Sequence, residues 1–273
     1  MIRDICVVLD DVGERAGAYA TSLAKIFDAS LSGLCVLPDT PFATFAYAEV
    51  SYEMVASARE DAIAAARAAS ARFQDHARGS GLAVACEVVC APMPVATEQL
   101  EQTVRLADLV VIEQPDPERR RPADHHLDTV LLRSGRPALV VPYIQRHEPK
   151  FGHATVAWDG SATAARALGD ALPLLRRMSR VEVVNVVRAG DEQDRDFAPK
   201  LARHLARHGI DAEFRRLPSA IPVAETILSH VADAGSDLLV MGAYGHSRLR
   251  EALLGGASRG ILSSMAVPVL MAH

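Results

Sequence analysis

Apolar segments of two lengths alternate along this chain, and their order is repeated. Short runs rich in β-branched residues are separated by longer segments of helical period, which is the pattern of parallel strands joined by crossover helices. The same order of five strands and four helices occurs in both halves of the sequence. The sequence therefore predicts two tandem α/β domains, with strands at residues 5–9, 31–36, 83–89, 109–113 and 138–142 and then at 154–158, 181–187, 212–216, 238–241 and 267–271.

The boundary between the repeats is expected in a polar stretch at residues 143–152, which contains Pro149 and has no period. A chain of 273 residues is long enough for two domains that each bury a core. We therefore expect domains at residues 1–145 and 152–273, each a doubly wound, Rossmann-like parallel sheet. The first repeat also contains an aromatic segment at 38–52, interpreted as a lid or packing loop, and a long alanine-rich helix after it.

The composition argues against several classes of protein. The formal net charge is −5 and the longest basic run is the triplet Arg119 to Arg121, so a nucleic-acid partner is not expected. The N-terminal residues resemble neither a signal peptide nor a membrane span, which predicts a cytoplasmic protein without a membrane partner. The four cysteines, and His125 and His126, lack the spacing of a metal site, so we expect buried thiols, solvated histidines and no metal.

The candidate binding segment follows the strand at 238–241. The chain passes through Gly242 and Gly245 and reaches Gly255-Gly256-Ala257-Ser258, where a further helix begins. Glycine at a strand end lets backbone N–H groups approach an anion, and a helix N-terminus adds positive potential. Open parallel sheets bind ligands beyond the carboxyl ends of their strands, where Asp159 also lies. Residues 242–258 are therefore a candidate phosphate site, the alternative being ordinary strand-to-helix turns.

These residues resemble the ATP-binding members of the universal stress protein family, in a tandem two-domain form. Those members carry GxxG, nine residues and then a glycine followed by Ser or Thr, and Gly242, Gly245 and Gly255 match that spacing. Gly256 departs from the motif, which has a hydroxyl there, so binding is expected to be weakened by the loss of one hydrogen bond. Ser258 matches a further hydroxyl position of the family.

The resemblance also implies the remaining contacts with the ligand. Asp159 is similar to the aspartate that contacts the adenosine part, and Val186 to the residue that packs on adenine. Ala157 and Trp158 would flank the base, although Trp158 equally suits a core position. The implied cofactor is ATP, and whether Mg²⁺ accompanies it stays open.

The same resemblance implies how the two domains associate. Each would have an adenine nucleotide alpha hydrolase-like fold, and a pseudo-twofold axis would relate them. The last strands, 138–142 and 267–271, would pair across this axis, which would hide two apolar edges. One chain would then imitate a homodimer, and a further homodimer of whole chains stays open.

The first repeat lacks the glycine segment of the second. Glu113, Asp116 and Glu118 stand there among prolines, and no glycine occurs between Gly81 and Gly135. Acidic side chains repel an anion and prolines donate no N–H group. We therefore interpret the first repeat as a degenerate partner domain.

The function that follows is a regulatory module that binds an adenine nucleotide through its C-terminal domain. No residue is assigned a catalytic role, because the segment shows no recognisable catalytic pattern. A slow ATPase or nucleotidyl transferase, and an interaction protein with vestigial pockets, are the alternatives. Under the favoured hypothesis, valine at Gly242 or Gly255 would abolish binding while the fold survives.

Overall fold

The computed structural model describes residues 1–10, 14–39, 51–115, 124–188, 197–245 and 256–273. Strands and helices alternate through the first half, as the periodicity predicted. They are β1 (Asp4–Leu9), α1 (Glu14–Phe27), β2 (Ser30–Asp39), α2 (Tyr52–Gly79), β3 (Ala85–Pro92), α3 (Met93–Val104), β4 (Leu109–Glu113), α4 (Asp124–Arg133) and β5 (Ala138–Val141).

The second half repeats this order. Its elements are β6 (His153–Ala157), α5 (Ala162–Leu175), β7 (Arg180–Arg188), α6 (Ala198–Arg207), β8 (Ala212–Ser219), α7 (Val223–Asp233), β9 (Leu238–Gly242), α9 (Ala257–Ser264) and β10 (Val269–Ala272). All ten expected strands are present, with ends that differ from the expected ones by up to three residues. The two tandem α/β repeats are therefore confirmed.

The chain divides into two compact units. The N-terminal unit comprises residues 2–136 with 146–148, and the C-terminal unit comprises residues 137–145 and 149–273 with Met1. Strand order is β3-β2-β1-β4 in the first unit and β5-β10-β9-β6-β7-β8 in the second. All pairs within these orders are parallel except β5 with β10, which is antiparallel with Val140 opposite Val269. β5 is grouped with the C-terminal unit because of this pairing.

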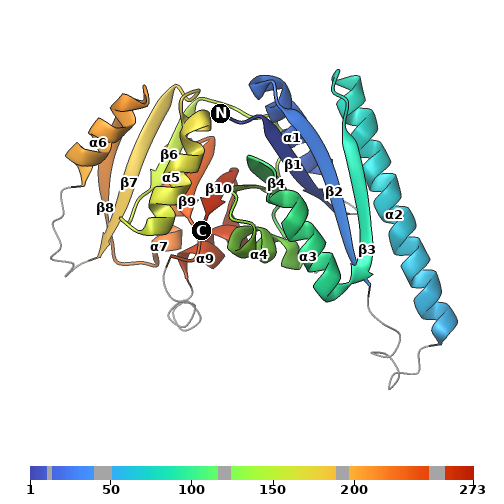
Figure 1. The fold of residues 1–273 in the computed structure, drawn as a ribbon. Helices are drawn as coiled ribbons and strands as arrows, with labels where there is room; N and C mark the ends of the chain where they lie inside the picture. The colour runs from blue at the N-terminus through green and yellow to red at the C-terminus, as the bar shows by residue number, and fades with distance from the viewer. Residues whose placement is uncertain (11–13, 40–50, 116–123, 189–196, 246–255) are drawn as a thin grey trace. The chain divides into compact units, whose positions relative to one another are not determined.

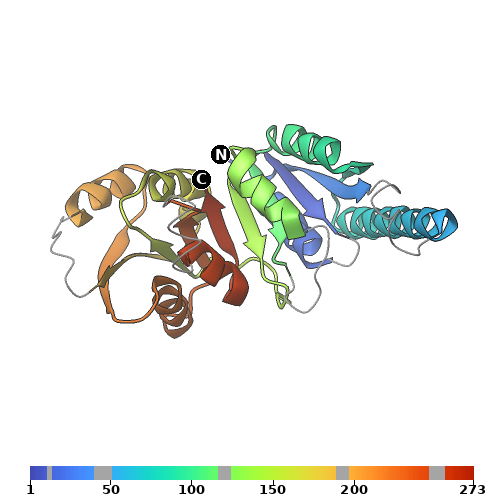
Figure 2. The same ribbon diagram turned by 90° about the horizontal axis from the view of Figure 1, so that it is seen from below.

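Helices cover both faces of the strands in each unit (Figures 1 and 2). In the N-terminal unit α1 and α2 lie on one face and α3 and α4 on the other, and in the C-terminal unit α5 and α6 lie opposite α7 and α9. Strands covered on both faces read as continuous apolar runs instead of alternating ones. This explains why the residues 5–9 of β1 are all buried, as are the first four residues of β9.

Cysteine and histidine side chains of the N-terminal unit differ in their burial. The thiols of Cys6 and Cys35 are buried and those of Cys86 and Cys90 are partly buried, and none of these four described cysteines forms a disulfide. The expectation of two solvated histidines was wrong for one of them, because His126 is only 6% exposed. It lies on the side of α4 that packs inward, which the local polarity around it concealed.

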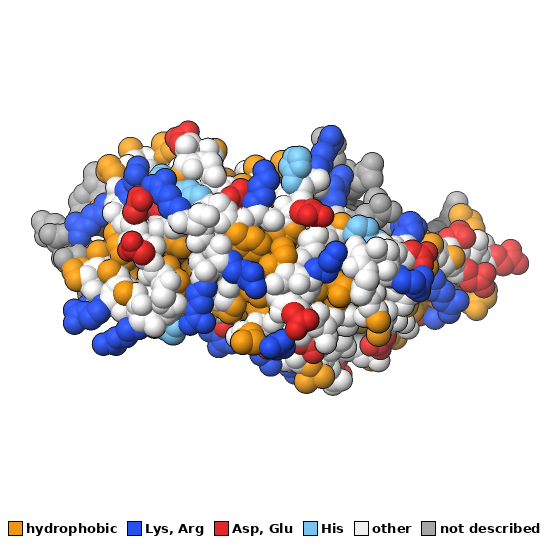
Figure 3. All heavy atoms as spheres, turned by 90° about the horizontal axis from the view of Figure 1, so that it is seen from above, with side chains coloured by type: hydrophobic (Ala, Val, Ile, Leu, Met, Phe, Trp, Pro, Cys, Tyr) orange, Lys and Arg blue, Asp and Glu red, His pale blue; other side chains and the backbone are white. Residues whose placement is uncertain are grey.

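None of the described helices has the length and apolar character needed to cross a bilayer. On the face drawn in Figure 3, basic and acidic side chains are interspersed among apolar and polar ones, without a broad field of one sign. Most of the aromatic segment at 38–52 and the residues Asp116 and Glu118 lie outside the described residues.

Candidate functional site

The candidate site lies where β6 and β9 end side by side. Val156 of β6 is paired with Val240 of β9, so the segments that follow both strands emerge at the same edge. β7 extends on the other side of β6 and β10 on the other side of β9, which makes this edge the point where strand order reverses. Ligands of doubly wound sheets bind at such a point.

The segment after β6 is fixed by two short-range hydrogen bonds. The amide of Ser161 donates to Oδ1 of Asp159 at 2.9 Å, and Gly160 between them has a φ of 77°. The hydroxyl of Ser161 then accepts from the amide of Ala164 at 3.1 Å and caps α5. Asp159 is exposed at this edge.

Gly242 and Gly245 lie against the first turn of α5. A Cβ atom built on Gly242 would stand 2.6 Å from the amide nitrogen of Ala164 and 2.6 Å from Oγ1 of Thr163. One built on Gly245 would stand 2.6 Å from the same Oγ1 atom. Both glycines are therefore required by packing, independently of any ligand. The expectation that the fold survives valine at Gly242 has to be revised, because the clash involves the helix backbone.

The main-chain groups of the bend between these glycines are held by three hydrogen bonds. The amide of Ala243 donates to the carbonyl of Ala272 at 2.8 Å, and its own carbonyl lies 3.0 Å from Nδ1 of His273. Tyr244 follows with a φ of 51°, in the left-handed region that non-glycine residues rarely adopt. Its amide donates to the hydroxyl of Ser258 at 3.0 Å.

This last hydrogen bond brings the start of α9 to the bend. Gly256 is the N-cap residue of α9 and supplies no side-chain cap, and Ala257 is the first helical residue. The first N–H groups of any helix have no intrahelical acceptor, so they are available to an anion. The expected helix after the glycine segment is thus confirmed, whereas Gly255 and the residues 246–254 lie outside the described residues.

The apolar part of the candidate site is built on β6 and β7. Ala157 is paired with Val184, and the amide of Trp158 donates to the carbonyl of Val184 at 2.8 Å. The side chain of Asn185 in turn donates to the carbonyl of Trp158 at 2.8 Å. Ala157, Trp158 and Val186 are each partly buried, so the strand ends present accessible apolar surface beside Asp159.

The described residues among those expected from the sequence lie at this edge, and other residues lie beside them. Thr163 and Asn185 were missed because each acts through a contact with another segment, whereas the contacts of Ser161 are local. The Ser161 hydroxyl at the start of the α5 periodicity was the one available signal, since serine is a preferred N-cap residue. Among the described residues no group of three or more His, Cys, Asp or Glu is placed to hold a metal ion.

The corresponding edge of the N-terminal unit has the opposite character. Glu113 ends β4 as Gly242 ends β9, and its side chain is 7% exposed. Its Oε2 accepts from the amide of Ala16 in α1 at 3.4 Å, and its Oε1 lies 3.4 Å from Nη1 of Arg15. A carboxylate of the chain itself therefore lies at the N-terminus of α1, beside the strand end that corresponds to the glycine bend.

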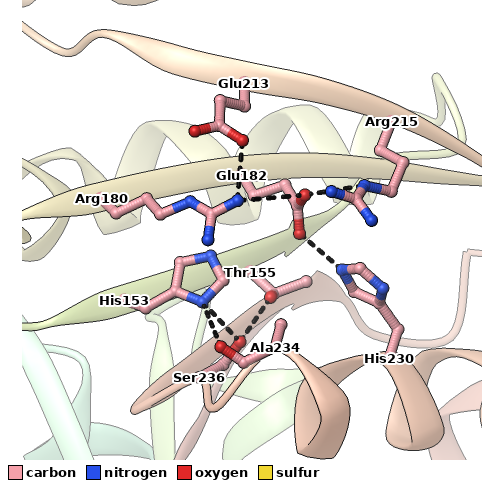
Figure 4. A network of polar contacts seen from close by, with 9 residues as sticks. All are labelled: His153, Thr155, Arg180, Glu182, Glu213, Arg215, His230, Ala234 and Ser236. Carbon is pink, nitrogen blue, oxygen red and sulfur yellow. Dashed lines mark hydrogen bonds and ion pairs between the residues drawn. The ribbon is translucent and has the colours of Figure 1, made fainter.

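A second polar cluster of the C-terminal unit lies near the beginning of its strands (Figure 4). Glu182 of β7 is 1% exposed, and its carboxylate contacts Nε2 of His230 at 2.5 Å and Nε of Arg215 at 3.0 Å. Nearby, the hydroxyls of Thr155 and Ser236 lie 2.7 Å apart. Because this cluster is remote along the strands from Gly242, it is interpreted as a buried ion-pair network that fastens α7 to the sheet.

Comparisons with known proteins bear on both halves. The sequence profile of the Universal stress protein family matches residues 150–273. A universal stress protein of Archaeoglobus fulgidus DSM 4304 superposes with a TM-score of 0.73 and 13% identity, over 98% of this chain and 96% of its own. A putative universal stress protein of Pseudomonas aeruginosa UCBPP-PA14 gives a TM-score of 0.61 and 15% identity, over 99% and 93%.

A functionally unknown protein of Pseudomonas aeruginosa PAO1 gives a TM-score of 0.60 and 15% identity, over 99% of this chain and 92% of its own. At such identities the likeness concerns the fold alone. No curated protein sequence matches this chain. The C-terminal part of the chain, residues 150–273, is therefore a domain of the universal stress protein family, and the chain has the fold of that family along nearly its whole length.

Proposed function

We propose that the C-terminal unit binds an adenine nucleotide, ATP, and acts as a regulatory module in the stress response. The observation that carries the proposal is the junction of two segments at the carboxyl edge of β9. There the amide of Tyr244, in the bend after Gly242, meets the hydroxyl of Ser258 in the first turn of α9 at 3.0 Å. A glycine-lined bend beside a helix N-terminus is suited to a phosphate group.

The proposed roles divide between the two sides of the edge. The phosphates would lie at the N–H groups that begin α9, next to Gly256 and Ala257. Asp159, a hydrogen-bond acceptor that would repel phosphate, would receive a ribose hydroxyl. Ala157, Trp158 and Val186, which are apolar and partly buried, would surround the adenine.

The contrast with the N-terminal unit supports this choice of unit. Where β9 ends in Gly242, β4 ends in Glu113, whose carboxylate already contacts the first turn of α1. A phosphate placed beside the end of β4 would meet the negative charge of Glu113. This side chain is 7% exposed, so water screens its charge poorly. We therefore propose one nucleotide per chain. A cytoplasmic location, the association of the two domains through their last strands, and further dimerisation remain predictions.

The experiment that tests the proposal changes only the charge at the start of α9. Asn and Asp are equally good N-cap residues, so Gly256→Asn and Gly256→Asp should both preserve the helix. The aspartate places a negative charge against the ligand, and the asparagine does not. We expect calorimetric titration with ATP to show binding weakened about tenfold or more by Asp relative to Asn. Equal affinities in the two variants would show that no anion binds at this helix.

A second experiment separates the proposal from its alternatives. Protein purified from cells and denatured with acid should release an adenine nucleotide that chromatography identifies. Release of no nucleotide, together with no heat on titration, would favour a ligand-free interaction protein. Steady conversion of ATP to ADP by the purified protein, abolished by Gly256→Asp, would favour the slow ATPase.

A further inference from the structure

Ser258 was expected to offer its hydroxyl to the ligand, but its observed contact is with another part of the protein. Its side chain is 2% exposed, and its Oγ accepts the amide of Tyr244 across fourteen residues of sequence. A hydroxyl that is enclosed and already engaged in this way is poorly placed to serve as a phosphate ligand. It is well placed to fix the main chain of the bend.

Tyr244 needs such a constraint because of its backbone conformation. Its φ is 51°, in the left-handed region, which is unfavourable for residues other than glycine. Conformations of this kind persist only where the surroundings impose them, and they are enriched at ligand sites. Here Ala243 is held on one side by Ala272, and Tyr244 is held on the other by Ser258.

We propose that Ser258 is a positioning residue, which holds Tyr244 in the left-handed conformation and so keeps the glycine bend preformed beside α9. The effect of Ser258 on nucleotide binding rests on the proposed function. Its effect on the conformation of Tyr244 does not require a ligand. Because the amides of Ala243 and Tyr244 already donate within the protein, the phosphate is received by the first turn of α9.

A double-mutant cycle tests the inference through the backbone preference of glycine. Glycine adopts the left-handed region without strain, so Tyr244→Gly removes the need for the constraint. We expect Ser258→Ala to weaken ATP binding about tenfold in the wild-type background and less than about threefold in the Tyr244→Gly background. Ser258→Thr, which keeps a hydroxyl, should bind like the wild type. If Ser258 contacted the phosphate directly, alanine would cost the same factor in both backgrounds, and the inference would be overturned.

The same cycle is measured on ligand-free protein by urea unfolding, which separates this inference from the proposed function. We expect the unfolding equilibrium constants of the two single variants to combine non-additively, by more than about threefold. A wild type that binds no ATP but shows this coupling would refute the function and keep the positioning role. If Ser258→Ala fails to fold, we expect the additional change Tyr244→Gly to restore folding. Additive effects, or failure to fold in both backgrounds, would overturn the inference.

Discussion

The carboxylate of Glu113 accepts a hydrogen bond from the backbone amide of Ala16, the third residue of α1, at 3.4 Å. In the C-terminal unit the counterpart of this contact is the approach of Gly242 to the amide of Ala164, the third residue of α5. The two units therefore use the same meeting of a strand end and a helix start in opposite ways. In the N-terminal unit, the Glu113 carboxylate accepts a hydrogen bond from the start of the helix. In the C-terminal unit, Gly242 has no side chain, so its main chain comes close to the start of the helix.

Removing that carboxylate should affect stability and leave nucleotide binding unchanged. Glu113→Ala loses a long hydrogen bond and an ion pair to Arg15, whose side chain is 47% exposed. We expect the free energy of unfolding to fall by about 1 kcal/mol, as measured in urea. Glu113→Gln, which keeps a hydrogen-bond acceptor, should lose less. A gain in ATP stoichiometry from one to two per chain in Glu113→Ala would show that this carboxylate alone closes the first unit.

The two glycines of the bend should differ in how their substitution is rescued. Alanine at Gly245 would meet a side-chain atom, Oγ1 of Thr163, whereas alanine at Gly242 would also meet the backbone of α5. We expect Thr163→Ala to restore most of the stability lost in Gly245→Ala and little of that lost in Gly242→Ala. Each loss is expected to be about 1–3 kcal/mol in urea unfolding. Equal rescue of both variants would mean that α5 can move away from β9.

Much of the fold was predictable because it depends on local patterns. The apolar runs that became β1 and β9 are buried on both faces, so their composition alone distinguishes them from helices. The glycine segment was predictable for a similar reason, since Gly242 and Gly256 stand directly at a strand end and a helix start. The departure of Gly256 from the family motif is likewise visible as a helix that lacks a side-chain cap.

The remaining features depend on contacts between distant residues. Glu113 and Ala16 are 97 positions apart, and nothing near either of them in sequence indicates the other. Ser258 was expected to offer its hydroxyl to a ligand, and only the three-dimensional fold shows that this hydroxyl accepts a hydrogen bond from the amide of Tyr244. The burial of His126 was missed for the same reason, because a helix start with two adjacent histidines has no local sign of which one faces inward.

The buried carboxylate of Glu182 should make its partner His230 important for stability. His230→Ala removes a contact at 2.5 Å to a side chain that is 1% exposed, and leaves the charge to Arg215 and Arg180 alone. Losing one hydrogen-bond partner of a buried carboxylate is costly, and the remaining arginines reduce the effect, so we expect a loss of about 2 kcal/mol in urea unfolding. The matched control is His125→Ala, an exposed helical histidine, which should change stability by less than about 0.5 kcal/mol. Comparable losses in both variants would contradict the role assigned to the Glu182 cluster.

The buried thiol of Cys6 should make the protein labile to alkali. Desolvation by burial raises the pKa of Cys6 from 9.0 to about 11, with the neighbouring Asp4 acting in the same direction and a hydrogen bond with Ser32 opposing it. A pKa that is higher in the folded state gives stability that is fully present below the unfolded value and lost as pH rises through the folded value. Between pH 9 and pH 11 the wild type should therefore lose about 2 kcal/mol more stability than Cys6→Ala, as measured by urea unfolding at each pH. Parallel stability curves for the two proteins, or rapid labelling of Cys6 by a thiol reagent at pH 8, would contradict this account of its burial.

Replacing Gly256 by serine should strengthen the proposed nucleotide site. The residue has a φ of −56° and a ψ of 149°, which serine adopts without strain, and it caps α9 without a side-chain hydrogen bond. A serine hydroxyl can accept an N–H group of the first turn in the free protein, or donate to a phosphate in the complex. We expect an affinity gain of about 1 kcal/mol, or roughly fivefold, in calorimetric titration with ATP. Gly256→Ala supplies the same backbone restriction without the hydroxyl and should not reproduce the gain, so an equal increase in both variants would assign the effect to chain stiffness and not to the missing hydrogen bond.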